Sequence, residues 1–280
     1  MSGRPGKQPR SRDGARGSQG SKAAPARQPK ARARPGWRVV SAEFELSAPE
    51  LRACPAGDRP EIAVAGRSNV GKSSLLNAFA SRRGLARVSR TPGRTRLLNF
   101  FTITLRHPKR GDRSFRWVDL PGYGYAAAAR SVRQQFGPMI EGYLAGRDVL
   151  RGLVLLIDSR RGVREEDVEL VHFMGAHGVP TLVVATKADK LSKGERGLVP
   201  RTIAEQLGCH SGDIVLTSAL AGDGLGDDGR RGGLAAELAA LVAPREPARD
   251  EEESPREPAR DDNETALAAE PPEAERRAGG

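Results

Sequence analysis

The sequence predicts an α/β fold in which a mostly parallel central sheet lies between two layers of helices. It also predicts a disordered tail at each end of the chain. Two observations predict it. Short apolar runs alternate with segments of helical periodicity along the middle of the chain, and the runs 153–157 and 182–185 are apolar at every position. A strand that is apolar throughout is typical of a parallel sheet covered on both faces, because neither side of the strand meets water.

The expected elements follow one another in a regular order. The run 61–65 is followed by glycine and then by helical periodicity over 73–80. Further strands are expected near 97–105, 114–119, 152–158, 181–186 and 213–217, and further helices near 131–145, 165–177, 200–207 and 233–242. Pro200 fits the first turn of its helix, where a missing N–H costs nothing. In such a sheet ligands bind at the carboxyl ends of the strands.

The two ends of the chain differ in composition from the middle. Residues 1–36 hold ten Lys or Arg against one acid, and residues 244–280 hold twelve acids against six Arg with the heptapeptide PREPARD repeated. Such segments bury too little apolar surface to fold. We therefore expect a disordered basic arm (1–36), an extension leading into the core (37–59), one folded domain (60–243) and a disordered acidic tail (244–280).

The folded part is itself basic. Of the formal net charge of +11, the arm carries +9 and the tail −6, which leaves +8 on residues 37–243. A basic domain with a basic arm suggests a polyanionic partner such as RNA. A solvated basic surface produced by a GC-rich genome is the alternative.

The sequence gives no sign of a membrane segment or of a metal site built from cysteine and histidine. Its apolar runs are too short to span a bilayer, and its N-terminus has no apolar signal region. The two cysteines and four histidines lack ligand spacing. We expect a cytoplasmic protein without membrane contact, and a monomer.

The loop after the first strand is a complete G-x-x-x-x-G-K-S motif, formed by Gly66, Arg67, Ser68, Asn69, Val70, Gly71, Lys72 and Ser73. Glycines let the backbone wrap a β-phosphate, and the helix that follows offers free N–H groups to anionic oxygens. Lys72 would reach the β- and γ-phosphates, and Ser73 would offer its hydroxyl to Mg²⁺. The motif predicts binding of a nucleoside triphosphate.

A second motif, Asp119, Leu120, Pro121 and Gly122, ends the strand that includes Trp117 and Val118. Its carboxylate can bind Mg²⁺ through water, and the Gly122 N–H can meet a γ-phosphate. An ordinary turn is the alternative, since the sequence suits one.

A third motif, Thr186, Lys187, Ala188 and Asp189, follows the strand 182–185. A carboxylate here can accept both the N1–H and the N2–H of guanine, whereas adenine has no such pair of donors on that edge. Lys187 would cover the base plane with its methylene stem. Thr186 replaces the more usual Asn, and a polar loop of balanced charge is the alternative.

A fourth motif, Thr217, Ser218 and Ala219, ends the last strand and would place backbone N–H groups at guanine O6. Each motif ends its own strand, in the order that a guanine-nucleotide domain requires. The sequence therefore predicts a three-layer P-loop NTPase G domain that binds GTP and GDP.

The chain resembles the EngB family of bacterial GTPases, within the TrmE-Era-EngA-EngB-like group, over about residues 40–242. The resemblance is carried by GRSNVGKSSLLNAF (66–79), LARVSRTPGRTRLLNFF (85–101), VDLPGYGYA (118–126) and TKADKLSKG (186–194). It implies a slow, Mg²⁺-dependent GTPase that acts as a nucleotide switch in assembly of the large ribosomal subunit. It also implies a need for the protein in normal cell division and septation.

The resemblance extends to single positions. Thr95 looks like the switch residue that joins Ser73 in binding Mg²⁺, within a nucleotide-contacting run of Gly93, Arg94, Thr95, Arg96 and Leu97. With Lys72 and Gly122, Thr95 completes the expected catalytic set. Segments 84–96 and 122–130 would be the two switches. The tails and the glycine-rich insertion 222–233 lie outside the family pattern.

Tyr123 stands where Ras-like GTPases carry a glutamine that orients the attacking water. A phenol does not replace that amide, so we expect slow hydrolysis that depends on a partner or on a monovalent cation. Asn69 resembles a ligand for K⁺ beside the phosphates; the alternative is that it only shapes the loop. Another alternative is that Gln134 or Gln135 reaches the site.

Two other classes of function stay open at this point. One is a nucleotide-gated adaptor that binds RNA or the ribosome and for which hydrolysis is incidental. The other is a P-loop ATPase or kinase, which Asp189 disfavours because its carboxylate suits guanine.

Overall fold

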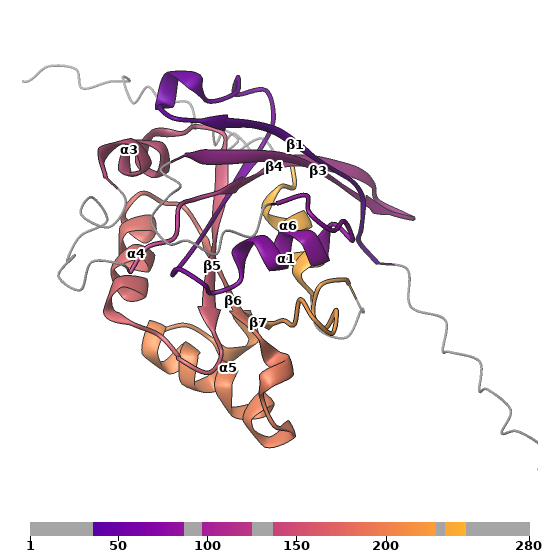
Figure 1. Cartoon of the computed structure of the whole chain (residues 1–280), viewed down its shortest axis with the longest axis vertical. Helices are drawn as coiled ribbons and strands as arrows, with labels where there is room; N and C mark the ends of the chain where they lie inside the picture. The colour runs from indigo at the N-terminus through magenta and orange to yellow at the C-terminus, as the bar shows by residue number, and fades with distance from the viewer. Residues whose placement is uncertain (1–35, 87–96, 125–136, 228–232, 245–280) are drawn as a thin grey trace, which may run out of the picture.

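A computed structural model describes residues 36–86, 97–124, 137–227 and 233–244 of the chain (Figure 1). Its centre is a sheet in the order β1-β3-β4-β2-β5-β6-β7. The strands are β1 (Arg38–Ala48), β2 (Glu61–Gly66), β3 (Leu98–His107), β4 (Gly111–Asp119), β5 (Leu150–Asp158), β6 (Thr181–Thr186) and β7 (Ile214–Leu216). Strands β4, β2, β5, β6 and β7 are mutually parallel, whereas β1 and β3 pair antiparallel on one side. The expected mostly parallel α/β sheet is confirmed.

Helices cover both faces of this sheet. They are α1 (Lys72–Phe79), α3 (Pro138–Gly146), α4 (Glu165–Ala176), α5 (Lys193–Leu207) and α6 (Leu234–Leu241). Helices α1 and α6 pack into one apolar cluster with the sheet, and α3, α4 and α5 pack into the other. In Figure 1, α3 and α4 lie to the left of the central strand β5, and α1 and α6 lie to its right. The result is the three-layer arrangement that the apolar strands indicated. No helix in the described ranges has the length and apolar character needed to cross a membrane.

The alternation of side chains along β2 shows how one strand serves both layers. Ile62 and Val64 belong to the cluster with α1 and α6, whereas Ala63 and Ala65 belong to the cluster with α3, α4 and α5. All four are fully buried. Successive residues of a strand point to opposite faces, so an unbroken apolar run is what two covered faces require.

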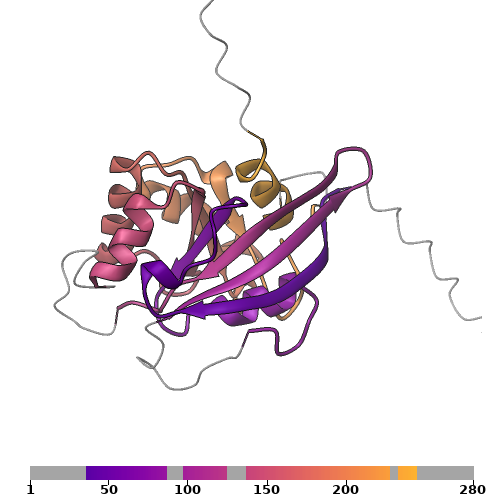
Figure 2. The same cartoon turned by 90° about the horizontal axis from the view of Figure 1, so that it is seen from above.

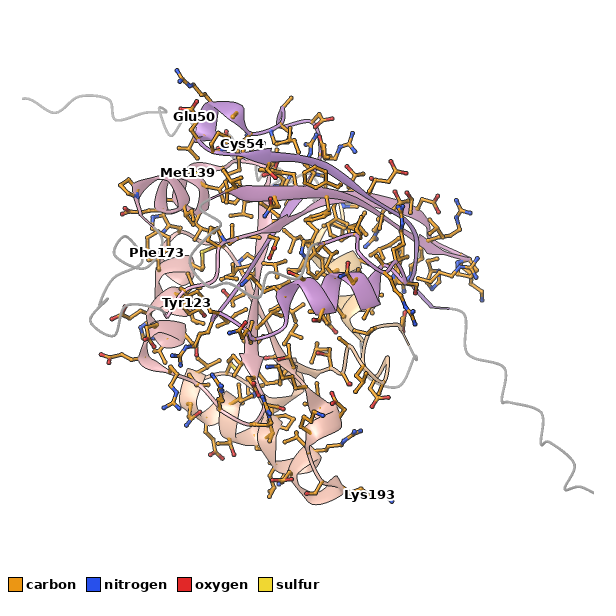
Figure 3. The ribbon with its side chains drawn as sticks, in the orientation of Figure 1. Glu50, Cys54, Tyr123, Met139, Phe173 and Lys193 are labelled. Carbon is orange, nitrogen blue, oxygen red and sulfur yellow. The ribbon has the colours of Figure 1, made fainter. Side chains whose placement is uncertain are left out.

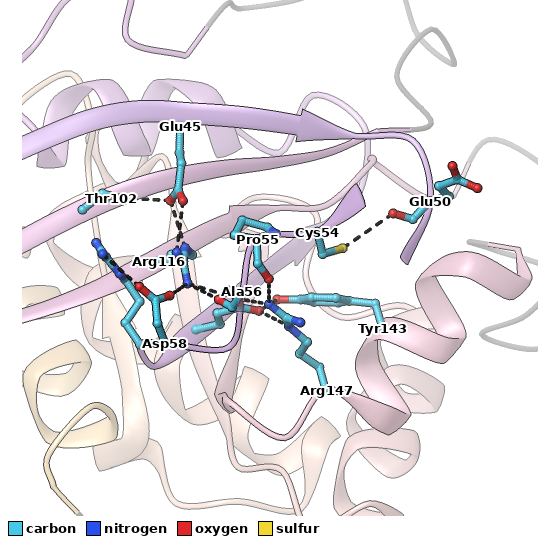
Figure 4. Close-up of polar contacts among 12 residues, drawn as sticks. Glu45, Glu50, Cys54, Pro55, Ala56, Asp58, Thr102, Arg116, Tyr143 and Arg147 are labelled. Atoms are coloured by element: carbon cyan, nitrogen blue, oxygen red, sulfur yellow. Dashed lines mark hydrogen bonds and ion pairs between the residues drawn. The ribbon is translucent and has the colours of Figure 1, made fainter. Parts of the chain in front are cut away.

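A buried polar network fixes β1 and α3 to the amino ends of the central strands (Figure 4). The Arg116 guanidinium, which is 3% exposed, donates to both carboxylate oxygens of Glu45 at 2.9 and 3.0 Å. Glu61 is fully buried at the start of β2 and accepts from Arg147 at 2.6 and 2.9 Å and from the Tyr143 hydroxyl at 2.9 Å. Buried charges of this kind persist only when each is paired and hydrogen-bonded. The network lies at the end of the sheet opposite the sequence motifs.

The prediction that Pro200 begins its helix is wrong. Helix α5 begins at Lys193, and Pro200 lies in its interior. The start is set by a capping box: the Ser192 Oγ accepts from the Glu195 N–H at 3.3 Å, and the Ser192 N–H donates to the Glu195 carboxylate at 2.8 Å. This pair satisfies free N–H groups of the first turn and outweighs the signal of the proline.

Other boundaries also differ from the sequence analysis. Residues 37–59, expected to lead into the core, contain a strand that was not among the predicted elements: β1, which pairs along β3. Helix α3 begins at Pro138, while the earlier part of the expected helix 131–145 falls mostly on residues outside the described ranges.

Part of the glycine-rich stretch 222–233 packs against the core. Leu225 is 8% exposed, and its carbonyl accepts from the Ala235 N–H at the start of α6. Asp227 accepts a 3.2 Å hydrogen bond from the Trp37 N–H, which joins residues 190 positions apart. Trp37 is itself buried and lies under the Arg113 guanidinium, 4.8 Å from its ring centre. Arg113 also donates to the carbonyl of Ala239 in α6.

Candidate functional site

Four of the sequence motifs lie at one edge of the sheet, because each follows the carboxyl end of a parallel strand. The loop 66–73 follows β2, 119–122 follows β4, 186–189 follows β6 and 217–219 follows β7. A pocket of about 310 Å³ opens between the first, third and fourth loops. Its walls are formed by Val70, Gly71, Ser74, Leu75, Thr186, Lys187, Asp189, Thr217, Ala219 and Leu220. This volume is within the range of small-molecule sites.

The phosphate-binding loop is shaped by backbone conformations that ordinary residues avoid. Gly71 has φ 115°, which a side chain would strain, and it directly precedes α1. Asn69 has φ 64° in the left-handed region, which asparagine tolerates better than most residues. The loop is joined to the next motif by the Ser68 N–H, which donates to the Tyr123 carbonyl at 3.1 Å. The N-terminus of α1 is therefore presented at the rim of the pocket, where it can attract an anion.

Lys72 and Asp119 form the charged centre of this edge. The Lys72 ammonium folds back on its own loop and donates to the Gly66 carbonyl at 3.2 Å. Burial lowers the pKa of Lys72, and the charge of Asp119 opposes that change. Burial raises the pKa of Asp119 to about 6, while the charge of Lys72 opposes the rise. Each charge therefore helps to keep the other ionised.

One carboxyl oxygen of Asp119 supports a metal-linked role. Its Oδ1 is buried and has no hydrogen-bond partner within the described part of the chain. A buried unpaired acceptor is unusual, and a metal-bound water would satisfy it. The described residues form no cluster of three or more His, Cys, Asp or Glu that could hold a metal alone. Mg²⁺ fits this arrangement, because it retains waters and takes phosphate oxygens as ligands.

Gly122 approaches the phosphate-binding loop so closely that a side chain here would force its neighbours to shift. A Cβ atom at this position would lie 3.0 Å from the Ser68 Oγ and 3.2 Å from the Lys72 Nζ. The backbone of Gly122 is thus directly beside the lysine that would hold the phosphates. Glycine permits this approach, and its N–H can meet a phosphate oxygen there.

The residues that would recognise a base are tied to the phosphate-binding loop. The Thr186 hydroxyl is buried and lies 2.8 Å from the Val70 carbonyl oxygen and 3.2 Å from that of Ile157. The Ala188 N–H donates to the Thr217 carbonyl at 3.0 Å, which joins the third motif to the fourth. The departure from asparagine at Thr186 therefore keeps a hydrogen bond between the third motif and the first.

Lys187 is held across the pocket by two partners. Its ammonium donates to the Asn69 carbonyl at 2.7 Å and to the Asp158 carboxylate at 2.9 Å. Burial opposes ionisation of Asp158, but hydrogen bonds from Arg160 and Lys187 outweigh it and hold the pKa of that carboxyl well below its usual range. Asp158 thus remains an anion that orients the lysine stem along the pocket.

Asp189 presents a charged acceptor to the same pocket. Its Oδ1 accepts from the Ser218 hydroxyl at 2.7 Å, and this hydrogen bond lowers the pKa of Asp189. The Ser218 Oγ in turn accepts from the Ala221 N–H at 3.0 Å. The carboxylate is therefore oriented as well as ionised, as a ligand with two adjacent N–H donors requires.

Tyr123 is not among the residues that line the pocket, and it lies beside α4 (Figure 3). Its side chain is 2% exposed, and its hydroxyl donates to the Asp167 carboxylate at 2.5 Å. Burial first, and Asp167 second, hold the pKa of Tyr123 well above its usual range, so the phenol stays protonated. Its place between the motif loop and α4 is structural.

The structure brings together four of the five predicted groups of site residues. Gly93, Arg94, Thr95 and Arg96 lie outside the described residues, and Leu97 is described only as the residue before β3. Four further residues belong to the site without having been predicted from the sequence: Ser74, Leu75 and Leu220 in the pocket wall, and Asp158 behind it. Asp158 could have been predicted as a site residue, since it is the first charged residue after the apolar run 153–157.

Comparison with known proteins places these features in a family context. Residues 61–187 match a family model described as "50S ribosome-binding GTPase". The chain is 48% identical over 207 residues to a probable GTP-binding protein EngB of Anaeromyxobacter dehalogenans, covering 74% of this chain and 93% of that one. It is 47% identical over 182 residues to the protein of the same name from Geotalea daltonii, covering 65% and 84%.

Among solved structures, the fold is similar to that of Aquifex aeolicus Era Y63A bound to GDP.AlF4-, with a TM-score of 0.51 and 23% identity. The match covers 67% of this chain and 58% of that one. At this level of identity the similarity shows the fold.

Proposed function

This chain belongs to the EngB family of GTP-binding proteins and is a GTPase, and we propose that it acts as a nucleotide-controlled switch in assembly of the large ribosomal subunit. One observation carries the nucleotide part of the proposal: the pocket is lined both by Asp189, which is suited to guanine, and by Gly71 at the start of α1, which is suited to phosphates. We include in the proposal a cytoplasmic location, a monomeric state, and the link to cell division and septation that the family resemblance implies.

Recognition of guanine is assigned to the far end of the pocket. The Asp189 carboxylate, oriented by Ser218, would accept the N1–H and N2–H of the base, and the N–H groups at 217–219 would donate to its O6. The stem of Lys187, fixed by Asn69 and Asp158, would lie over the base plane. A base without that pair of N–H donors would leave the carboxylate unpaired, which is the physical source of selectivity.

Binding of the phosphates is assigned to the loop 66–73 and to Gly122. Lys72 would exchange its contact with the Gly66 carbonyl for phosphate oxygens, and the free N–H groups at the start of α1 would add further donors. When bound, Mg²⁺ supplies charge neutralisation at the β- and γ-phosphates. Ser73, Asp119 and, from the sequence, Thr95 are the residues proposed to hold it.

Among the described residues, the one that follows Gly122 is not suited to orienting the attacking water, and this supports slow hydrolysis. Tyr123 occupies the position after Gly122, but its hydroxyl is bound to Asp167 and buried. The chain would therefore rely on positioning of the phosphates and on charge supplied by Lys72. We propose that a monovalent cation beside Asn69, K⁺ in particular, supplies further positive charge.

The same observation keeps the adaptor function as the second candidate. If hydrolysis stays negligible even with the ribosomal partner present, the nucleotide would only gate binding. Multiple-turnover assays with and without large ribosomal subunits separate the two: stimulation supports the GTPase switch, and an unchanged low rate supports the adaptor.

The proposed partner is tested by sedimentation of the full chain with large ribosomal subunits. We expect the protein loaded with a non-hydrolysable GTP analogue to pellet with the subunits and the GDP-loaded protein to remain largely in the supernatant. Equal pelleting in both states would reject the switch.

A further inference from the structure

A cluster of basic side chains lies at the turn between β3 and β4, far from the nucleotide pocket. The register of the sheet places Arg38, at the start of β1, opposite Arg106 near the end of β3. Figure 2 shows this turn extending beyond the helices, with the start of β1 beside it. We define the hairpin-end cluster as Arg38, Arg106, Lys109, Arg110 and Arg113.

Most of the charge in this cluster is not neutralised. Arg106 is paired with Asp112 through two hydrogen bonds of 2.8 Å. Within the described part of the chain, the side chains of Arg38, Lys109 and Arg110 have neither an ion pair nor a hydrogen bond, and all three residues are exposed. The turn therefore carries uncompensated positive charge.

The backbone that carries these charges is held in place. The His107 Nδ1 accepts hydrogen bonds from the N–H groups of Lys109 and Arg110 at 3.1 and 3.2 Å. The His107 ring lies 5.2 Å from the ring of the buried Trp37, which also contacts Arg113. The two cations thus project from an ordered turn, which lowers the entropy cost of binding a polyanion.

The basic arm joins the domain at this same place. Residues 1–36, with ten Lys or Arg and one acid, connect directly to Trp37 beside the cluster. Beyond its first methionine the arm has no aromatic residue and no Val, Leu, Ile or Met, so it lacks the side chains with which a basic segment inserts into a membrane. Phosphates of RNA require only the charge.

The position of the cluster separates it from the nucleotide. Strand β4 has nine residues between Gly111 at the turn and Asp119 at the phosphate edge. At about 3.3 Å per residue, its two ends lie roughly 26 Å apart. A contact at the turn does not touch the loops that would respond to the γ-phosphate.

We propose that the hairpin-end cluster binds RNA phosphates in both the GTP and the GDP state. This inference rests on the proposed ribosomal function and adds to it a nucleotide-independent anchor. The anchor sets the baseline affinity for RNA, and the switch adds affinity in the GTP state.

The test compares two full-length variants that each lose two charges. Lys109→Gln/Arg110→Gln removes charge from the turn but keeps the backbone contacts to His107. Lys193→Gln/Arg201→Gln removes two exposed charges from α5 and is the matched control. Binding to large ribosomal subunits, and to RNA extracted from them, is measured at several salt concentrations in the GTP-analogue and GDP states.

For the turn variant we expect affinity to fall by the same factor in both states, with the slope of log affinity against log salt reduced by about one to two. The control should bind like the wild type, and both variants should bind GTP normally. Wild-type affinity of the turn variant, an equal loss in the control, or a loss confined to one nucleotide state would overturn the anchor. Binding of the same variants to anionic phospholipid vesicles is measured as well. If the turn variant loses vesicle binding but keeps RNA binding, the anchor is also overturned.

The two proposals fail in distinguishable ways. If the wild type binds equally in both states but the turn variant binds more weakly, the switch is wrong and the anchor stands. If the turn variant matches the wild type while state dependence persists, the anchor is wrong and the switch stands.

Discussion

The Thr186 hydroxyl donates a 2.8 Å hydrogen bond to the carbonyl oxygen of Val70, and so joins the base-binding loop to the phosphate-binding loop. The link is buried, since Thr186 is 4% exposed. It couples the geometry of the two ends of the pocket before any nucleotide arrives.

We expect Thr186→Val to lower the affinity for GTP and for GDP by the same factor, roughly fivefold or more, because a buried hydrogen bond contributes about 1 kcal/mol. Part of the binding free energy would then be used to order the loop. Thr186→Ser, which keeps the hydroxyl, is the control and should bind almost like the wild type. Fluorescent-nucleotide titrations measure both, and wild-type affinity in Thr186→Val would show that the link is not needed.

For Asp189→Asn we expect preference to move from guanosine to xanthosine triphosphate. An amide can donate to the C2 oxygen of xanthine, where the carboxylate accepts from the guanine N2–H. Competition between the two nucleotides measures the change, and Glu195→Gln, a carboxylate outside the pocket, serves as the control. Unchanged GTP affinity in Asp189→Asn would contradict the assignment of the guanine site.

Asp158→Asn should lower the affinity for GTP and for GDP alike, by roughly tenfold, and should change the hydrolysis rate at saturating GTP only a little. The substitution removes the carboxylate charge that holds Lys187 over the base, and hydrogen bonds to charged groups are worth about 1.5 to 3 kcal/mol. Arg160→Gln is the matched control: Arg160 pairs with the same carboxylate, but its side chain is 43% exposed and exposed pairs contribute little. A fall in maximal rate without a change in affinity would argue against this positioning role.

Ser73→Ala should raise the Mg²⁺ concentration needed for tight GTP binding by at least the ~10-fold typical of losing a group that supports a metal site. Lys72→Ala should weaken GTP binding at every Mg²⁺ concentration, because it removes a charge at the phosphates. Titrations of Mg²⁺, with EDTA as the zero point, distinguish the two patterns. An unshifted Mg²⁺ curve in Ser73→Ala would exclude its hydroxyl as a ligand.

Hydrolysis should be faster in K⁺ than in Na⁺, and Asn69→Ala should remove the difference. An arginine that stabilises the transition-state charge in related enzymes is worth about 10³- to 10⁵-fold, so partial substitution by a cation is measurable. Rates at equal ionic strength provide the comparison. Identical rates in the two salts would leave Asn69 only its role in shaping the loop.

The sequence predicted the central strands and four of the site loops because their signals are local. An unbroken apolar run predicts a strand covered on both faces, and a glycine-rich loop before a helix carries its chemistry in adjacent residues. Strand β1 lacked such a signal. It is an edge strand with Phe44 52% exposed and with register shifts at Val39/Ser41 and Phe44/Leu46, which break the period of two.

Contacts between distant loops could not be read from the chain. The partners Asp158 and Lys187 are 29 residues apart, and Thr186 and Val70 are 116 apart. Their meeting depends on the order of strands in the sheet. The start of α5 is different: the capping box at Ser192 and Glu195 is a local signal in the sequence, and it determines the start of the helix although Pro200 follows.

The two contacts of Arg113, with Trp37 and with the Ala239 carbonyl, bring the first strand and the last helix of the domain together. The arm, which carries +9, and the tail, which carries −6, are therefore tethered to the same side of the domain. Tethering gives two segments a high effective concentration for each other, in the millimolar range for short flexible links. In the proposed ribosomal function, RNA would then compete with an acidic segment of the same molecule for the basic arm, so removing residues 244–280 is expected to leave RNA binding equal or tighter.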